Sequence, residues 1–589
     1  MASDHTSAGL SLLTIEFGFT SILLALAWCF PQTGAKFFQR LGRTFRDLAR
    51  RKRLCVVAVG VTAGLLRLAI LPLSPIPRPY VSDEFSYLLA SETFASGRLT
   101  NPAPAMWAHL ESFHIDLKPT YMSMYFPAQG MLLAAGQIIA GNPWWGVWAS
   151  SVLMCAAICW MLQGWLPPVW ALLGGVIAVL RLALFSYWMD SYWGGALPAF
   201  AGALVLGSVP RLCRSFRARD FFWMALGMAL LALSRPYEGL LVCVPAVVAV
   251  AWSLWKRPHP SASVIIFRVA PALSLLIAAV AFTGYYDYRV FGKVSTPPYK
   301  VNRDTYASAP HFVFQAARPE PVYRYKAMRD FYTGLELRWF EDMQTGRGFL
   351  RKTLRKAGMA GFFYFGAALL LPMAVLPKIL FDRRIRFLVV VGSIFAVGLA
   401  LETWLIPHYA APFTAGIYAI LLQCMRHLGA RRRGNSAGLF IVRATPVLCV
   451  AMVLLRISAQ PLHIRLPGGK MLTSYGSTPV GLAREHVLKE LENLPGRQLA
   501  IVRYRPDHDT YEEWVYNHAD IDRSKVVWAR DMDAAGNAKL LSYYADRKAW
   551  LVEPDSDPPA VSPYPGSAER DLKLGFSLVS AAQSMSVKP

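Results

Sequence analysis

Apolar runs of about 20 residues recur along this 589-residue chain and constrain its fold more than any other feature. Each run can cross a bilayer core of roughly 30 Å as a helix. The chain is 54% hydrophobic and only 17% charged, which is less charge than a soluble protein of this length carries. We therefore expect a polytopic α-helical membrane protein. Twelve spans are predicted, at residues 10–30, 54–73, 143–164, 167–187, 194–212, 221–234, 237–255, 264–284, 358–377, 386–406, 409–425 and 438–457.

Basic residues in the short connections set the expected orientation. Segment 36–53 holds eight Lys and Arg residues against a single acid, Asp47. The positive-inside rule places this segment in the cytoplasm. The same rule applies to the basic connections at 211–219, 256–257, 378–386 and 426–443. Both chain ends and the long loops 74–142 and 285–357 are then expected on the opposite face.

The net charge of +24 follows this pattern, because most of it lies between apolar runs. It fits membrane orientation and anionic lipid headgroups, and it excludes nucleic acid as the expected partner. A further basic group, Arg351 to Lys356, falls in the predicted outer loop 285–357. Long loops are translocated largely regardless of charge, so this group does not reverse the orientation.

Three regions are predicted. Residues 1–53 form an extra N-terminal transmembrane helix and a basic cytoplasmic loop, and residues 54–457 form the main membrane region. Residues 458–589 contain no apolar span. A helical pattern at 480–494, strands at 498–504, 525–530 and 548–553, and a helix near 537–545 predict a small extracytoplasmic α/β domain.

The eight cysteines all lie in or beside apolar runs, so neither a disulfide framework nor a Cys/His metal site is expected. No Asn-x-Ser/Thr sequon occurs, which favours a bacterial inner membrane over a eukaryotic lumen.

An acidic pair, Asp83 and Glu84, stands just beyond the run 54–73 on the predicted outer face. A carboxylate in a dehydrated cleft can take a proton from a hydroxyl group. Tyr87 follows Asp83 at i, i+4 and shares its face if the segment is helical. The alternative is a solvated helix start, where acidic side chains are favoured by the helix dipole.

Three other predicted outer turns carry candidate binding residues. Each has a structural alternative: an interfacial aromatic belt around Asp190 and Tyr192, an ion pair that closes the turn between Arg235 and Glu238, and an interfacial histidine at His408. Arg67 and Arg181 lie in the outer halves of spans, where long side chains can snorkel. The candidate residues of these turns are Asp190, Tyr192, Arg235, Glu238, Glu402, His408 and Tyr409.

The first outer loop resembles a known family. Asp83-Glu84, Tyr87, Ala90 and Gly97-Arg98-Leu99 are similar to the corresponding loop of GT-C-fold membrane glycosyltransferases, closest to protein mannosyltransferases and lipid A aminoarabinose transferases. Lys118-Pro119-Thr120-Tyr121 stands where that family has a Lys-Pro element, with Thr120 in place of the usual second proline. The α/β tail is similar to that of the aminoarabinose-transferase branch.

The resemblance implies a sugar donor on a polyprenyl phosphate, transfer on the outer face, and Asp83 as the catalytic base, with Glu84 beside it. It also implies Lys118 and Tyr121 as substrate-binding residues. Arg235 and Lys118, with the 351–356 group, are expected to stabilise the departing phosphate. Binding of Mg²⁺ or Mn²⁺ by Asp83 and Glu84 stays open, because two carboxylates are too few to argue it.

We therefore expect an inverting glycosyltransferase that acts on a glycan, lipid or protein of the cell envelope. The alternative is a transporter or lipid flippase without glycosyl transfer. A protein of that kind needs ionisable residues near the bilayer midplane, whereas the candidates here gather at one face.

Overall fold

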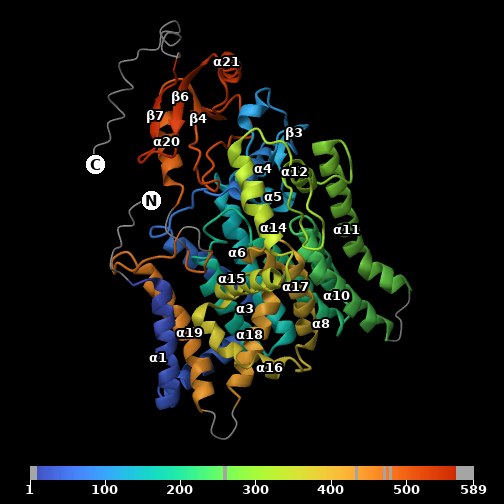
Figure 1. Cartoon of the computed structure of the whole chain (residues 1–589). Helices are drawn as coiled ribbons and strands as arrows, with labels where there is room; N and C mark the ends of the chain where they lie inside the picture. Colours follow the sequence, from blue (N-terminus) through green and yellow to red (C-terminus); the bar gives the residue numbers. More distant parts are fainter. Residues whose placement is uncertain (1–9, 257–261, 431–435, 469–471, 477–479, 566–589) are drawn as a thin grey trace.

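The computed structural model describes residues 10–256, 262–430, 436–468, 472–476 and 480–565, which form a helical bundle with a small sheet domain at one end (Figure 1). Seven of its helices are long and apolar enough to cross a membrane. They are α1 (Leu12–Cys29), α3 (Lys52–Ile70), α6 (Trp144–Trp165), α10 (Pro236–Trp255), α11 (Ala262–Phe291), α15 (Gly346–Met373) and α19 (Ser436–Ile457).

The other predicted spans coincide with shorter helices. Three are apolar: α7 (Pro168–Ala178) continued by η2 (Val179–Ala183), α8 (Ala196–Leu212) and α17 (Arg386–Leu401). The last two, α9 (Ala218–Ala232) and α18 (Thr414–Leu428), have 15 residues each. The predicted α-helical membrane architecture is thus confirmed, with each of the twelve ranges overlapping a helix.

Helix α8 lies at the centre of the bundle and is buried along almost its whole length. Small residues let its neighbours approach closely, as is common between membrane helices. A Cβ at Gly202 would lie 1.8 Å from the carbonyl oxygen of Pro412 in η4 (Pro407–Phe413). Glycine at this position therefore allows η4 to pack directly on α8.

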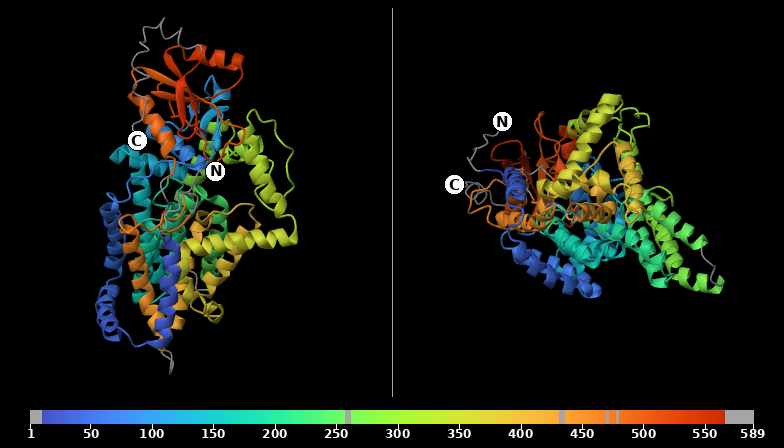
Figure 2. Two further views of the ribbon diagram at one scale, coloured as in Figure 1. Left: turned by 60° about the vertical axis from the view of Figure 1, so that its left-hand side comes forward. Right: turned by 90° about the horizontal axis from the view of Figure 1, so that it is seen from below.

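Two stretches and two arginines differ from the sequence-based expectation. The basic segment predicted as a loop is largely a helix, α2 (Ala35–Arg50), with exposed aromatic and basic side chains. The backbone of α15 breaks at Gly366, where φ is +56°, and in Figure 2 its first half runs across the bundle axis. Arg67 and Arg181 do not snorkel: both are buried, ion-paired with Asp190 at 3.0 Å and Glu16 at 3.4 Å respectively.

The two long loops are themselves folded. The first carries α4 (Ser82–Ala95), β1 (Asn101–Pro102), η1 (Trp107–Leu110), β2 (Ile115–Asp116), β3 (Thr120–Ser123) and α5 (Pro127–Ala140). The second carries α12 (Pro298–Tyr306), α13 (Lys326–Arg329), η3 (Asp330–Leu337) and α14 (Arg338–Asp342), and α16 (Leu376–Ile379) follows α15. Strand β3 pairs antiparallel with both β1 and β2, which fixes the course of the first loop.

The C-terminal region forms the predicted α/β domain. Its sheet has the order β5-β4-β6-β7, with β4 parallel to β5 and β6, and β7 antiparallel to β6. The predicted strands and helices are confirmed, and β7 was not predicted. The elements are α20 (Leu482–Asn493), β4 (Arg497–Val502), β5 (Val526–Arg530), α21 (Ala534–Tyr543), β6 (Arg547–Glu553) and β7 (Ala560–Pro563).

This domain is packed onto the first long loop. Phe85 and Leu89 of α4 share one hydrophobic core with Leu499 and Ile501 of β4. Arg530, buried, forms an ion pair with Glu513 at 2.5 Å and donates a hydrogen bond to the carbonyl oxygen of Glu111 at 2.6 Å. The sheet therefore fixes the position of α4, which carries the acidic pair.

The predicted region boundaries at 53/54 and 457/458 stay a prediction. Residues 1–9 and 566–589 of the outer regions lie outside the described residues, as do Arg257 and 431–433 of the predicted cytoplasmic connections.

Candidate functional site

The acidic pair opens helix α4, and the local sequence explains why. Val81 is extended and serves as the N-cap, so Asp83 and Glu84 fall in the first turn, where the helix dipole favours negative charge. Glu84 reaches back and accepts hydrogen bonds from the backbone N–H groups of Tyr80 and Val81 at 2.9 and 3.2 Å. This capping arrangement leaves Asp83 on a different face of the turn.

Asp83 faces a small group of aromatic and imidazole side chains. Its Oδ1 accepts a short hydrogen bond from the Tyr125 hydroxyl, and its Oδ2 lies 3.7 Å from Nδ1 of His114. The Asp83 side chain is 25% exposed, whereas His114 is buried. Burial lowers the pKa of His114, which favours its neutral form. A half-buried carboxylate held by a phenol is thus accessible to a hydroxyl group of a bound molecule.

Tyr87 connects Asp83 to a second charged pair. Its ring stacks on Tyr125 with centroids 4.5 Å apart. Burial raises the pKa of Tyr87; Arg235 opposes that shift, and the charges of Asp83 and Glu238 add to it. The charges of Asp83, Arg235 and Glu238 therefore all act on this phenol.

Arg235 is the residue before the proline that begins α10, so almost no loop separates it from the bundle. Its guanidinium forms an ion pair with Glu238 at 3.3 Å and lies 4.5 Å from the ring centre of Tyr409. The Arg235 side chain is 16% exposed. A guanidinium has five N–H donors, and a single carboxylate contact leaves donors for an anionic ligand.

Glu402 adds a buried acid, 1% exposed, whose carboxylate has no hydrogen-bond donor among the described residues. The charges that act on it come from Glu238, Arg235 and Lys356. A buried carboxylate without donors is costly, which is typical of a group kept for function rather than stability.

The structure therefore brings together five predicted residues and Asp83: Tyr87, Arg235, Glu238, Glu402 and Tyr409. Asp190, Tyr192 and Glu84 form a neighbouring group. Glu84 Oε1 accepts from the backbone N–H of Tyr192 at 3.0 Å, and Asp190 pairs with the buried Arg67. Burial raises the pKa of Glu84 to about 7 and that of Asp190 to about 6.

Three predicted residues do not contact Asp83, although the ring of His408 lies 5.2 Å from that of Tyr409. His408 is buried beside Tyr187, whose hydroxyl is 3.2 Å from its Nδ1. Tyr121 is buried and donates to the carbonyl oxygen of Asn517 in the C-terminal domain at 2.9 Å. Lys118 is exposed, with its ammonium group 3.7 Å from the Trp107 ring centre. None of these contacts joins the three residues to Asp83.

Sequence reasoning missed Tyr125 and His114, which contact Asp83 directly. Tyr125 follows strand β3, and His114 precedes β2 with a positive φ of 61°. The Ser86 hydroxyl of α4 lies 2.6 Å from the His114 carbonyl oxygen and 2.7 Å from the Ser123 hydroxyl. These contacts hold the segments that carry His114 and Tyr125 against α4. The positive φ of His114 marks it as a candidate functional residue, but this backbone angle is visible only in the structure. The sequence therefore holds no signal for either residue.

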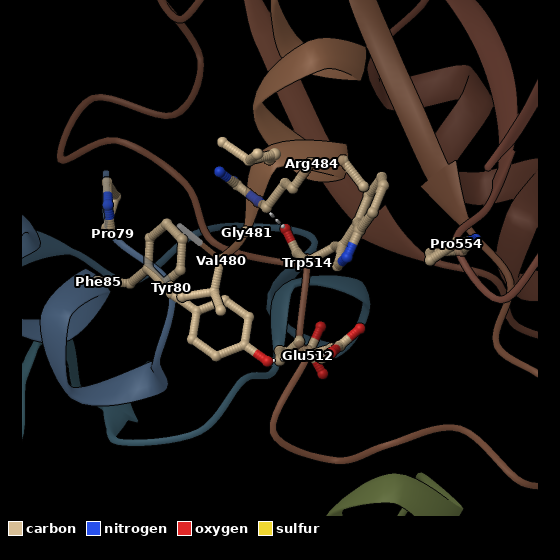
Figure 3. A pocket seen from close by; sticks show the side chains of 12 residues that line it. Pro79, Tyr80, Phe85, Val480, Gly481, Arg484, Glu512, Trp514 and Pro554 are labelled. Atoms are coloured by element: carbon tan, nitrogen blue, oxygen red, sulfur yellow. Dashed lines mark hydrogen bonds between the residues drawn. The ribbon is translucent and has the colours of Figure 1, made fainter. Parts of the chain in front are cut away.

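A cavity of about 260 Å³ lies between the start of α4 and the C-terminal domain (Figure 3). Tyr80 and Phe85 form one wall, and the Tyr80 hydroxyl donates to Glu512 at 3.0 Å. On the other wall, Arg484 donates to the carbonyl oxygen of Trp514 at 3.0 Å and lies 4.7 Å from the Phe85 ring centre. The C-terminal domain thus borders the same helix turn that holds Asp83.

Among the described residues, no three His, Cys, Asp or Glu side chains are grouped so that they could hold a metal ion. Asp83 and Glu84 also point to different partners: a phenol for Asp83, and backbone N–H groups for Glu84. The two carboxylates therefore do not form a common ligand pair.

The contacts of Glu84 yield a stability prediction. We expect Glu84→Gln to lower the thermal denaturation temperature, because the amide nitrogen of glutamine would face backbone donors that now meet carboxylate oxygens. An unsatisfied buried group costs about 1–3 kcal/mol. Differential scanning fluorimetry in detergent measures the shift, with Asp83→Asn as the matched change one residue earlier. A denaturation temperature equal to that of the unsubstituted protein would contradict the positioning role.

No family model and no curated protein matches the sequence. Among solved structures, the chain is similar to ArnT from Cupriavidus metallidurans, solved in the apo state and bound to undecaprenyl phosphate. The apo structure gives a TM-score of 0.43 at 13% identity, over 88% of this chain and 94% of the other. The undecaprenyl phosphate complex gives 0.42 at 12% identity, over 85% and 92%.

It is also similar to the Archaeoglobus fulgidus oligosaccharyltransferase tethered to an acceptor peptide, with a TM-score of 0.39 at 12% identity over 84% of this chain and 68% of the other. Both proteins are GT-C glycosyltransferases, the class named by the sequence resemblance. A likeness at this level assigns no substrate, partner or residue role to this chain.

Proposed function

We propose that this protein is an inverting membrane glycosyltransferase. It transfers a sugar from a polyprenyl-phosphate donor to a glycan, lipid or protein acceptor on the extracytoplasmic face of a bacterial inner membrane. The observation that carries the proposal is that a carboxylate, Asp83, 25% exposed, and a cation, Arg235, 16% exposed, both act electrostatically on the Tyr87 phenol. An acid and a cation so placed suit a reaction with a nucleophile at one end and an anionic leaving group at the other.

In this reaction Asp83 takes the proton of the acceptor hydroxyl as its oxygen bonds to the anomeric carbon. The bond between that carbon and the phosphate oxygen breaks, and the electron pair leaves with the polyprenyl phosphate. The Tyr125 hydroxyl and the neutral His114 orient the carboxylate. Attack opposite the leaving group inverts the anomeric centre.

Arg235 would stabilise the negative charge that develops on the leaving phosphate by donating hydrogen bonds to it. Its guanidinium retains N–H donors beyond its contact with Glu238. Glu402 would accept hydrogen bonds from hydroxyl groups of the sugar, since its carboxylate has no donor among the described residues. Glu84 acts as a positioning residue that joins α4 to the turn at Tyr192. Of the predicted catalytic pair, Asp83 thus acts in the reaction and Glu84 positions the helix that carries it.

The test is turnover of a polyprenyl-phosphate-linked sugar by the purified full-length protein in lipid vesicles. We expect release of polyprenyl phosphate that depends on the protein and on an envelope extract as acceptor source. A panel of donors that differ in the sugar identifies the substrate. Translocation of the intact donor lipid across the vesicle, with no release of polyprenyl phosphate from any donor, would favour the flippase alternative.

The orientation gives a second prediction. In a Cys29→Ser background, which removes the exposed native thiol, we expect Ser96→Cys and Ala538→Cys to react with an impermeant thiol reagent in intact cells. Arg219→Cys should react only after the cells are opened. All three positions are exposed, so accessibility within the fold does not limit labelling. The reverse pattern would place Asp83 in the cytoplasm and contradict the proposed mechanism.

A further inference from the structure

The cavity between the start of α4 and the C-terminal domain has no part in the reaction proposed above, although it borders the Asp83 turn (Figure 3). Tyr80, on one wall, comes three residues before Asp83, so their Cα atoms lie within about 11 Å of each other. Glu512, on another wall, accepts a hydrogen bond from the Tyr80 hydroxyl at 3.0 Å. The cavity is therefore next to the position where an acceptor hydroxyl would contact Asp83.

Tyr511, the residue before Glu512, continues this wall toward Asp83. Its ring lies 6.3 Å from that of Phe331, which in turn lies 5.8 Å from the ring of His114. His114 is the imidazole beside Asp83. Burial raises the pKa of Tyr511, and nearby carboxylates, Asp83 among them, add to the shift. The loop after β4 thus leads from the Asp83 site to the cavity.

The charged side chains that line the cavity balance one another. Glu513 forms an ion pair with Arg530 at 2.5 Å and is thereby compensated. One carboxylate, Glu512, and one guanidinium, Arg484, are left on the walls. Because these two charges are opposite, the cavity has no net charge that would select an anion or a cation.

Both of these groups retain hydrogen-bonding capacity. Arg484 donates through Nε and Nη2 to the carbonyl oxygens of Trp514 and Tyr516 at 3.0 and 3.1 Å, which leaves the N–H groups of Nη1. Glu512 accepts from Tyr80 through Oε1, and its Oε2 accepts from no group in the part of the chain that the structure describes. One wall of the cavity can therefore donate to a ligand while another accepts from it.

The rest of the lining is aromatic and firmly held. Figure 3 shows the Tyr80 and Phe85 rings on the same side of the cavity. The Phe85 ring stacks on Tyr516 with centroids 4.3 Å apart, and the Arg484 guanidinium lies 4.7 Å from its centre. The same guanidinium lies 4.9 Å from the ring centre of Trp528. Since Phe85 is covered in this way, Tyr80 is the ring on which an apolar face of a ligand can lie.

We propose that this cavity binds one neutral sugar ring of a glycan acceptor, with hydroxyl groups on Glu512 and Arg484 and the C–H face of the ring on Tyr80. A sugar ring has the donors, acceptors and apolar face that these walls match. A hydrocarbon chain would leave both charged groups without partners. A peptide is disfavoured, because the Trp514 carbonyl oxygen already accepts from Arg484. The acceptor role rests on the proposed transfer reaction, whereas sugar binding does not.

The test is saturation-transfer NMR of the full-length protein in nanodiscs without donor. The probes are the methyl glycosides of glucose, galactose, mannose, rhamnose and N-acetylglucosamine, and we expect at least one to bind. Ala483→Phe fills the cavity from an exposed lining position and should weaken this binding at least about tenfold. Glu512→Gln should weaken it several-fold, because a charged acceptor makes the stronger hydrogen bond. Ala538→Phe and Glu490→Gln, the same changes at exposed positions of the domain outside the cavity, should leave binding unchanged.

Two further measurements separate this site from the transfer reaction. Asp83→Asn should bind the same glycoside unchanged, and that glycoside should inhibit transfer to the envelope acceptor. Absence of binding by every glycoside, equal loss in the cavity and control variants, or binding of the peptide Gly-Ser-Ala instead of a sugar would overturn the proposal. Binding without inhibition of an active enzyme would refute the acceptor role. Absence of turnover by a protein that binds the glycoside would refute the transfer reaction alone.

Discussion

Asp83→Asn is expected to lower the rate of sugar transfer by roughly 10²–10⁴-fold, the usual cost of losing a general base. Asparagine keeps the size of the side chain and can still accept the hydrogen bond from Tyr125, but it cannot take a proton. Donor binding and the denaturation temperature should stay unchanged, because the Asp83 side chain is partly exposed and does not cap the helix backbone. Single-turnover measurements with a radiolabelled donor separate the chemical step from binding.

Two further variants control this experiment. Asp304→Asn removes an exposed acid of the other long loop, which is ion-paired with Lys300 at the surface, and should leave turnover unaltered. Tyr125→Phe removes the hydroxyl that Asp83 contacts and should reduce the rate about tenfold, less than loss of the carboxylate itself. Unaltered turnover by a folded Asp83→Asn protein would exclude Asp83 as the base.

The helices could be predicted from the sequence because the length and composition of a membrane span are enough to identify it. An apolar run must satisfy its backbone internally, so length and composition suffice to place α3, α6 or α19. The C-terminal sheet could also be predicted, since its strands are short apolar runs separated by helical patterns. In both cases the pattern that identifies each helix or strand is local in the chain.

The surroundings of Asp83 could not be predicted, because its partners are distant in sequence. Tyr125 lies 42 residues away, and the contact of Glu84 with Tyr192 spans 108 residues. The Tyr125 contact depends on β3 and on its two-residue partners β1 and β2, which are too short to leave a sequence pattern. The acidic pair was recognisable, but the separate contacts of its two members were not.

Arg67 shows why the charged residues of spans were misjudged. A long basic side chain near a helix end usually reaches toward the interface. Here the guanidinium is fully buried and bonded to Asp190, 123 residues later in the chain. A partner at that distance is invisible to any local pattern, and only the fold shows that the charge is compensated inside the bundle.

Arg235→Ala is expected to reduce kcat/KM for the donor by at least about 100-fold, comparable to the loss of a strong oxyanion donor. Arg235→Lys keeps the charge but loses the planar fork, so it should retain partial activity. Both variants should bind the polyprenyl-phosphate donor more weakly. Binding of a fluorescent donor analogue in detergent measures this without catalysis.

Stability has to be separated from recognition in this case, because Arg235 also compensates the buried Glu238. Removing one member of a buried ion pair costs about 3–5 kcal/mol, so Arg235→Ala alone could fail to fold. In Arg235→Ala/Glu238→Gln the orphaned charge is absent, and we expect a folded protein that still does not bind the donor. Glu238→Ala, which keeps the cation, should bind it. Normal donor binding by the folded double variant would assign Arg235 to closing the turn before α10 rather than to the phosphate.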